Sequence, residues 1–177
     1  MAICVPFRKA LSTNSTSTGF TAQNTTTTAP SGTGIFNLLD SANWVGGGAK
    51  VPTHLMLMPF GTNGDNDTFD FRVYGYNRTN DATPVYVPQL LVDCSVVLCA
   101  ITATSIAADT FLADTITVND GPPAGTVWQA VTSTAEDMAS YVIIHTLGCQ
   151  YIKFDWDLAG AQEGASMNCL WRPVSVD

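Results

Sequence analysis

The sequence predicts an all-β protein, an antiparallel β-sandwich or jelly-roll-like domain with an extended N-terminal arm. Apolar and polar residues alternate with a period of two in several segments, and Gly, Pro and Asn turns separate about eight such segments. Neither an internal repeat nor βαβ spacing is present. The 177 residues suffice for one domain with a buried core. We assign the arm to residues 1–34 and the sandwich to residues 35–177.

The N-terminal region opens with a short apolar segment, Ala2–Phe7, that could form an edge strand. A run of Thr, Ser, Asn and Gly follows over residues 12–34, and it cannot bury enough apolar surface to order itself. Two interpretations stay open: a flexible linker, or an extended arm that becomes ordered on a neighbouring subunit. In the second case the arm would bind its partner through its large apolar side chains, Phe7, Phe20, Ile35 and Phe36.

The segments that follow the arm have strand patterns. Thr53–Phe60 is an apolar strand that ends at a turn rich in Gly, Asn and Asp. Thr68–Tyr76 alternates between two faces. One face carries Phe69, Phe71, Val73 and Gly75. Val85–Thr104 predicts one or two strands, and Pro84 and Pro88 confine the start of this run to a sheet edge or a bulge.

The second half of the chain contains the single helix-like stretch, Ser105–Asp114, which is one short turn at best. Strands are then predicted at residues 115–118, 126–132, 140–147, 150–158 and 165–174. Within 150–158, apolar Ile152, Phe154 and Trp156 alternate with charged residues, so one side of this strand faces the core.

The charge balance excludes two classes of partner. Seven Lys and Arg against fifteen Asp and Glu give 7 − 15 = −8, and charged residues make up 12% of the chain. So few cations cannot neutralise many phosphates, so we expect no nucleic-acid partner. No basic amphipathic helix and no apolar stretch of about 18–20 residues occurs, so we expect no membrane partner. The 23 Thr and 11 Ser instead favour neutral, hydrogen-bonded contacts with other proteins.

The cysteines favour a reducing compartment. Five occur, an odd number without a C-x-x-C pair: Cys4, Cys94, Cys99, Cys149 and Cys169. All but the first lie in apolar runs, and we interpret them as buried free thiols rather than as disulfides or a zinc site. Since no secretory signal is recognisable, we expect synthesis in the cytoplasm.

One loop resembles the oxygen-rich loops that bind calcium. Asp65, Asn66, Asp67 and Asp70 could supply three or four oxygen ligands. No Glu closes the pattern, however, and hairpin turns favour the same residue types for backbone reasons. We therefore expect a turn here and no bound metal.

Two carboxylates and two histidines are candidates for catalysis, and we interpret all four as structural. Asp155 and Asp157 lie at i and i+2 on one strand face, about 7 Å apart, as in some glycoside hydrolases. Lys153 on the same face indicates ordinary solvated charge. His54 and His145 lie in strands bordered by apolar residues, and no nucleophile or metalloprotease motif accompanies them. We expect hydrogen-bonded structural histidines, no catalytic residue and no cofactor.

Four segments resemble parts of small virion proteins of tailed bacteriophages. They are Gly61–Tyr76, Val87–Leu91, Phe111–Thr117 and Tyr151–Leu158, and they span most of residues 55–172. The resemblance implies a β-sandwich that coats the capsid surface of the virion as a decoration or cement protein. Such proteins commonly form trimers that clamp neighbouring major capsid subunits, and no catalytic residues carry over.

The primary hypothesis is therefore a non-enzymatic virion structural protein whose partners are the major capsid protein and itself, as a homotrimer. The alternative is a receptor- or glycan-binding module of a phage tail or head fibre. It would use exposed aromatic side chains such as Tyr74, Tyr76, Trp128 and Trp171. A third hypothesis is a carbohydrate-active enzyme that uses Asp155 and Asp157.

Overall fold

The computed structural model describes residues 8–10, 24–40, 51–62, 68–100, 110–120, 127–131, 140–158 and 166–174. This part of the chain holds ten strands, all paired in antiparallel fashion, and no helix, which confirms the predicted all-β class. The strands are β1 Arg8–Lys9, β2 Ile35–Asn37, β3 His54–Thr62, β4 Thr68–Arg78, β5 Tyr86–Ala100, β6 Thr110–Asp120, β7 Val127–Val131, β8 Tyr141–His145, β9 Tyr151–Leu158 and β10 Ser166–Val174.

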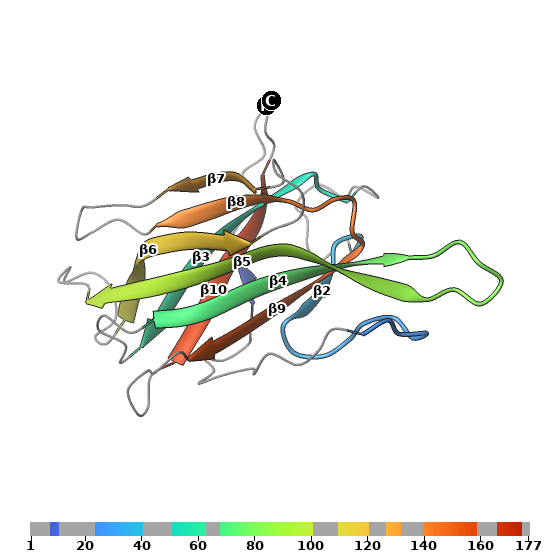
Figure 1. Ribbon diagram of the computed structural model, residues 1–177, viewed down its shortest axis with the longest axis horizontal. Helices are drawn as coiled ribbons and strands as arrows, with labels where there is room; N and C mark the ends of the chain where they lie inside the picture. Colours follow the sequence, from blue (N-terminus) through green and yellow to red (C-terminus); the bar gives the residue numbers. More distant parts are fainter. Residues whose placement is uncertain are drawn as a thin grey trace.

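The strands form a sandwich-like arrangement of two layers that are joined at one side (Figure 1). We call β2-β9-β4-β5-β6 the first sheet and β1-β10-β3-β8-β7 the second sheet. On one side β3 pairs with β10; on the other it pairs with β8 through His54–Leu57 and with β6 through Phe60–Thr62. Because β6 also pairs with β5, hydrogen bonding continues from one layer into the other.

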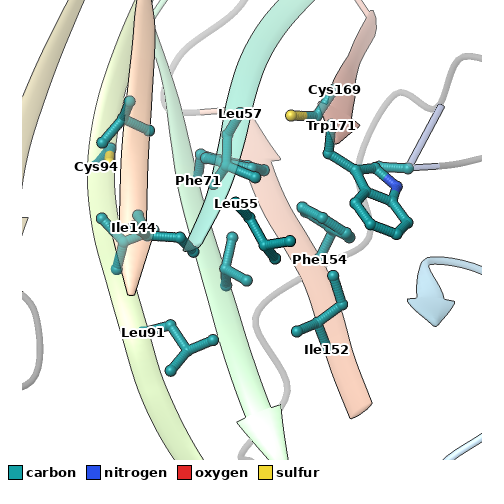
Figure 2. Packing of buried hydrophobic residues seen from close by; sticks show 14 of the residues in the cluster. Leu55, Leu57, Phe71, Leu91, Cys94, Ile144, Ile152, Phe154, Cys169 and Trp171 are labelled. Carbon is teal, nitrogen blue, oxygen red and sulfur yellow. The ribbon is translucent and has the colours of Figure 1, made fainter. Parts of the chain in front are cut away.

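The core lies between the two layers and follows the period-two pattern of the strands. In β4, Phe69, Phe71 and Val73 are fully buried and alternate with half-buried residues, as predicted. Figure 2 shows Leu55 and Leu57 of the second sheet in the same cluster as Phe71 of the first. Each such side chain contributes about 1.5–3 kcal/mol when it is removed from water.

Three cysteines belong to this core. Cys94, Cys149 and Cys169 are buried free thiols, as the sequence predicts, while Cys4 and the side chain of Cys99 lie outside the described part of the structure. Burial raises the pKa of Cys94 to about 12 and that of Cys149 to about 11. Because the thiolate is the reactive form, a raised pKa disfavours reaction of these thiols in the folded protein.

The helix-like stretch is a wrong prediction where the structure describes it. Thr110–Asp114 begins β6, and residues 101–109 lie outside the described ranges. Leu112 pairs with Cys99 of β5 on one side and with Phe60 of β3 on the other. This two-sided pairing overrides the helix propensity of the local Ala and Leu residues.

The β4–β5 hairpin extends past the other strands, at the right of Figure 1. Val85–Thr104 was expected to form one or two strands, and the described part of it forms the single strand β5. β5 pairs with β6 only from Asp93 onward. Pro88 therefore lies where β5 has no β6 neighbour, which agrees with the predicted edge position. Thr26 and Tyr86 exchange two backbone hydrogen bonds of 3.1 and 2.7 Å on this edge.

Candidate interaction surface

Two of the four predicted anchors are described, and both lie in β2. Ile35 and Phe36 are half-buried. The Phe36 ring lies edge-on to Phe154 and Trp171, with centroid distances of 5.8 and 4.9 Å. Phe36 therefore contacts both layers of its own sandwich at the open side, between β9 and β10.

Several predicted site residues lie outside the described residues: Phe7, Phe20, Asp65, Asn66, Asp67 and the side chain of Trp128. In the part of the chain that is described, no three His, Cys, Asp or Glu side chains gather to hold a metal ion. Asp70, the described member of the oxygen-rich loop set, accepts a hydrogen bond of 3.4 Å from the Ser95 hydroxyl.

The outer face of the first sheet carries two ion pairs. Arg72 Nε lies 2.5 Å from Asp93 Oδ2, and Lys153 Nζ lies 2.9 Å from Asp155 Oδ2. Asp155 is only 2% exposed, so its prediction as ordinary solvated charge is wrong. Cross-strand pairing sets Arg72 of β4 directly opposite Asp155 of β9. A carboxylate buried in this way needs a counter-ion, and Lys153 supplies it.

Four of the five tyrosines belong to the same outer face. Tyr76 pairs with Tyr151 in the β4–β9 register, and the rings of Tyr86 and Tyr151 meet edge-on at 5.4 Å. Tyr74 is half-buried, whereas Tyr76 is 5% exposed, and burial followed by the charge of Asp155 raises its pKa. The prediction of an exposed aromatic side chain is therefore wrong for Tyr76.

The same prediction is wrong for Trp171, for a different reason. Its side chain is fully buried, because the alternation of β10 directs it inward with Met167 and Cys169. Its ring stands 6.1 Å from that of Phe154 across the sandwich, as Figure 2 illustrates. Trp171 is a core residue and offers no surface to a ligand.

In the described strands, the outer face of the second sheet carries many apolar side chains and no acid. Within their described bounds, β1, β3, β7, β8 and β10 contain no Asp or Glu. Apolar side chains on the outer side of three adjacent strands are half-buried rather than buried: Met56, Met58, Tyr141, Ile143, Leu170 and Val174. We call these six residues the apolar face. Arg172 lies among them and donates from Nη2 to Met56 Sδ at 3.7 Å.

Sequence reasoning missed the apolar face, although β3 contains a signal for it. Leu55–Phe60 reads Leu-Met-Leu-Met-Pro-Phe and does not alternate. A strand with apolar residues on both sides is typical of one that is covered on both faces. An antiparallel sheet with one solvated face instead shows polar residues at every second position, as β4 does.

The two histidines of the chain face each other at one end of the apolar face. His54 on β3 pairs with His145 on β8, and their ring centroids lie 4.9 Å apart. His54 Nδ1 lies 3.0 Å from Thr53 Oγ1, and the Leu147 N–H donates to His145 Nδ1 at 2.8 Å. Burial, and then the neighbouring His145, lower the pKa of His54.

Comparisons with known proteins gave no match among protein-family models, curated proteins or solved structures. A search of the described residues for a helix long and apolar enough to cross a membrane also found none. Functional inference therefore rests on the chemistry of the two outer faces.

Proposed function

We propose that this chain is a non-enzymatic structural protein of a bacteriophage virion, a capsid decoration or cement protein that stabilises the major capsid protein. The apolar face is the observation that carries the proposal. A sandwich needs one apolar face on each sheet to form its core, and an additional one on an outer side marks a protein interface. The resemblance of four segments to phage virion proteins supports the same class.

The chemistry of the face defines the partner surface. Met56, Met58 and Ile143 require apolar side chains opposite them, and the positive charge of Arg172 among them favours a partner surface of negative charge. The edge strand β1 adds Arg8 and Lys9 to the same sheet, which carries no acid within its described strands. We therefore propose an apolar, carboxylate-bearing patch of a major capsid subunit as the occupant. A jelly-roll-like homotrimer would present three such faces about one symmetry axis.

Particle decoration with charge-insertion variants tests this function. Met56→Glu buries a carboxylate in the proposed interface, and we expect it to weaken particle binding by about tenfold or more. Thr117→Glu is the matched control, because Thr117 is exposed on the first sheet. Equal occupancy of particles by the two variants would contradict docking through the apolar face. Quantitative mass spectrometry of particles should also find hundreds of copies of the wild-type protein.

The tyrosine cluster favours a second candidate, a receptor- or glycan-binding module of a tail or head fibre. Tyr74, Tyr86 and Tyr151 are half-buried, and aromatic faces of this kind stack on sugar rings. This candidate predicts a few dozen copies or fewer per particle and loss of glycan binding in Tyr86→Ala. We do not propose the carbohydrate-active enzyme, because Asp155 is buried against Lys153 instead of facing a substrate.

A further inference from the structure

We propose that Thr26, Pro84 and Pro88 close one edge of the β4–β5 hairpin and prevent it from pairing with a second copy of the chain. We call the side of Tyr86–Val92 that faces away from β4 the open edge. The inference goes beyond the proposed function, because it concerns the free protein and follows from backbone contacts within the chain.

The open edge has the features of a strand that pairs with other chains. β5 pairs with β4 from Tyr86 onward, but with β6 only from Asp93 onward. Tyr86–Val92 reads Tyr-Val-Pro-Gln-Leu-Leu-Val and contains no charged residue. Apart from its proline, this composition is typical of segments that add to sheet edges. The hairpin also extends past the other strands in Figure 1, away from the two layers.

The backbone hydrogen bonds of the hairpin show which groups face the open edge. Val85 bonds toward β4, since its carbonyl accepts from the Thr79 N–H at 2.8 Å and its N–H donates to Thr79 Oγ1 at 3.1 Å. Tyr86 bonds to the other side, where its N–H donates to the Thr26 carbonyl at 2.7 Å and its carbonyl accepts from the Thr26 N–H at 3.1 Å. Because successive residues of a strand direct these groups to alternate sides, the even-numbered residues from 84 to 90 face the open edge.

Both prolines of this stretch lie at positions that face the open edge. Proline has no N–H, so Pro84 and Pro88 offer no donor on either side of Tyr86. Pro88 lies opposite Tyr76, and because residue 88 directs its backbone away from β4, this proline removes no hydrogen bond from the β4–β5 ladder. Two copies that paired in antiparallel fashion about residue 88 would set their prolines opposite each other and lose both central hydrogen bonds.

Thr26 occupies the position between the two prolines. Continued antiparallel pairing would place Thr28 opposite Pro84 and Asn24 opposite Pro88, yet the bridge at Thr26 is isolated. Thr28 instead donates its N–H to Thr26 Oγ1 at 3.3 Å, as in a turn of the backbone. The chain therefore uses the donor and the acceptor that lie between the prolines and does not continue along the edge.

Two other edge strands are protected by different means. β1 and β2 are only two and three residues long. β1 also carries Arg8 and Lys9, and charged side chains oppose pairing between like edges. The open edge is longer and has no charge, so its protection depends on the prolines and on Thr26.

Self-association of full-length variants tests the inference. A triple variant with Pro84→Thr, Pro88→Thr and Thr26→Pro restores both missing donors and removes the bridge. We expect it to associate with itself at least about tenfold more tightly than wild type in analytical ultracentrifugation, because each added hydrogen bond stabilises the pairing. Pro30→Thr is the matched control, since Pro30 lies in no strand, and we expect it to behave like wild type.

The Met56→Glu substitution separates the open edge from the apolar face. We expect the triple variant to associate equally with and without Met56→Glu, because β5 and β3 belong to different sheets. Near-UV circular dichroism at low concentration shows whether the triple variant is folded. Pro88→Thr alone is the milder variant, and we expect a smaller gain in the same direction.

A folded triple variant that associates no more tightly than wild type would overturn the inference. So would association that disappears with Met56→Glu, because it would then run through the apolar face. If the triple variant does not fold, an unchanged association of Pro88→Thr would count against the inference in the same way. The proposed function would survive each of these results, because it depends on the apolar face and not on β5.

Discussion

The two sheets share one core but present opposite chemistry to the outside. All six acids within described strands belong to the first sheet: Asp70, Asp93, Asp114, Asp120, Asp155 and Asp157. With Arg72, Arg78 and Lys153, its strands sum to 3 − 6 = −3. The described strands of the second sheet carry only the cations Arg8, Lys9 and Arg172. The strands of the two sheets together sum to −3 + 3 = 0, so the net charge of −8 comes from the residues outside the strands.

The side chains on the two outer faces are stabilised in different ways. On the first sheet, cross-strand neighbours of opposite sign satisfy one another, as Arg72 and Asp93 do. On the second sheet, apolar side chains remain half-buried, so the surface lowers its free energy when another molecule covers it. The two ion pairs of the first face form within the chain, whereas the proposed function assigns a partner protein to the second face.

The largest expected effect on stability comes from replacing a cation by Met, and this substitution should affect the two outer faces differently. Lys153→Met removes the ammonium group that lies 2.9 Å from the buried Asp155 carboxylate, and we expect the free energy of unfolding to fall by about 3–5 kcal/mol. Arg172→Met on the apolar face removes the hydrogen bond to Met56 Sδ, and no acid lies in the described strands of the second sheet, so we expect a loss below about 1 kcal/mol. Urea denaturation measures both. Equal losses would show that the two faces do not differ in this way.

A double variant isolates the cause of the first loss. Lys153→Met combined with Asp155→Leu removes both charges and replaces them by apolar volume. We expect it to recover most of the stability lost in Lys153→Met, because the cost comes from a buried negative charge that has lost an ion pair rather than from the missing ammonium.

A smaller effect is expected on the inner side of the first sheet. A Cβ at Gly75 would lie within 3 Å of Cys149, so Gly75→Ala overpacks the contact between β4 and the β8–β9 turn. We expect a loss of about 1–3 kcal/mol in thermal or urea unfolding. Gly148→Ala meets no atom and tests backbone strain alone, at about 1 kcal/mol. A reversed order would indicate that the sheet shifts to make room at Gly75.

The half-buried ion pair of the first sheet, Arg72 with Asp93, should contribute less again. The side chains of Arg72 and Asp93 are 32% and 14% exposed, so solvent and salt screen their attraction. We expect Arg72→Met to lower the free energy of unfolding by about 0.2–1 kcal/mol. The difference from wild type should shrink in about 0.5 M NaCl. If Arg72→Met lowered the free energy of unfolding as much as Lys153→Met does, Asp93 would depend on its ion pair as strongly as Asp155 does.

The sequence predicted the strands well because β4 and β9 have a clear period of two. It failed at Thr110–Asp114, where pairing with two neighbouring strands decides the conformation. It also failed at Asp155 and Trp171, whose burial depends on which side chains lie opposite them in space. The alternation of apolar and polar residues shows which face of a strand points into the core. Burial of the side chains on the outer face, however, depends on neighbours that are distant in sequence.

The smallest expected effect decides whether the apolar face is truly a surface of the free chain. If it is, Met56→Glu places its carboxylate in water and changes the free energy of unfolding by no more than about 0.5 kcal/mol, as Thr117→Glu does on the first sheet. Met56→Glu should also reduce self-association in light scattering, because it interrupts the patch, whereas Thr117→Glu should not. A loss of several kcal/mol in Met56→Glu alone would mean that the chain itself covers this face. The second sheet would then be as complete as the first, and its acid-free strands would form an interior instead of a docking surface.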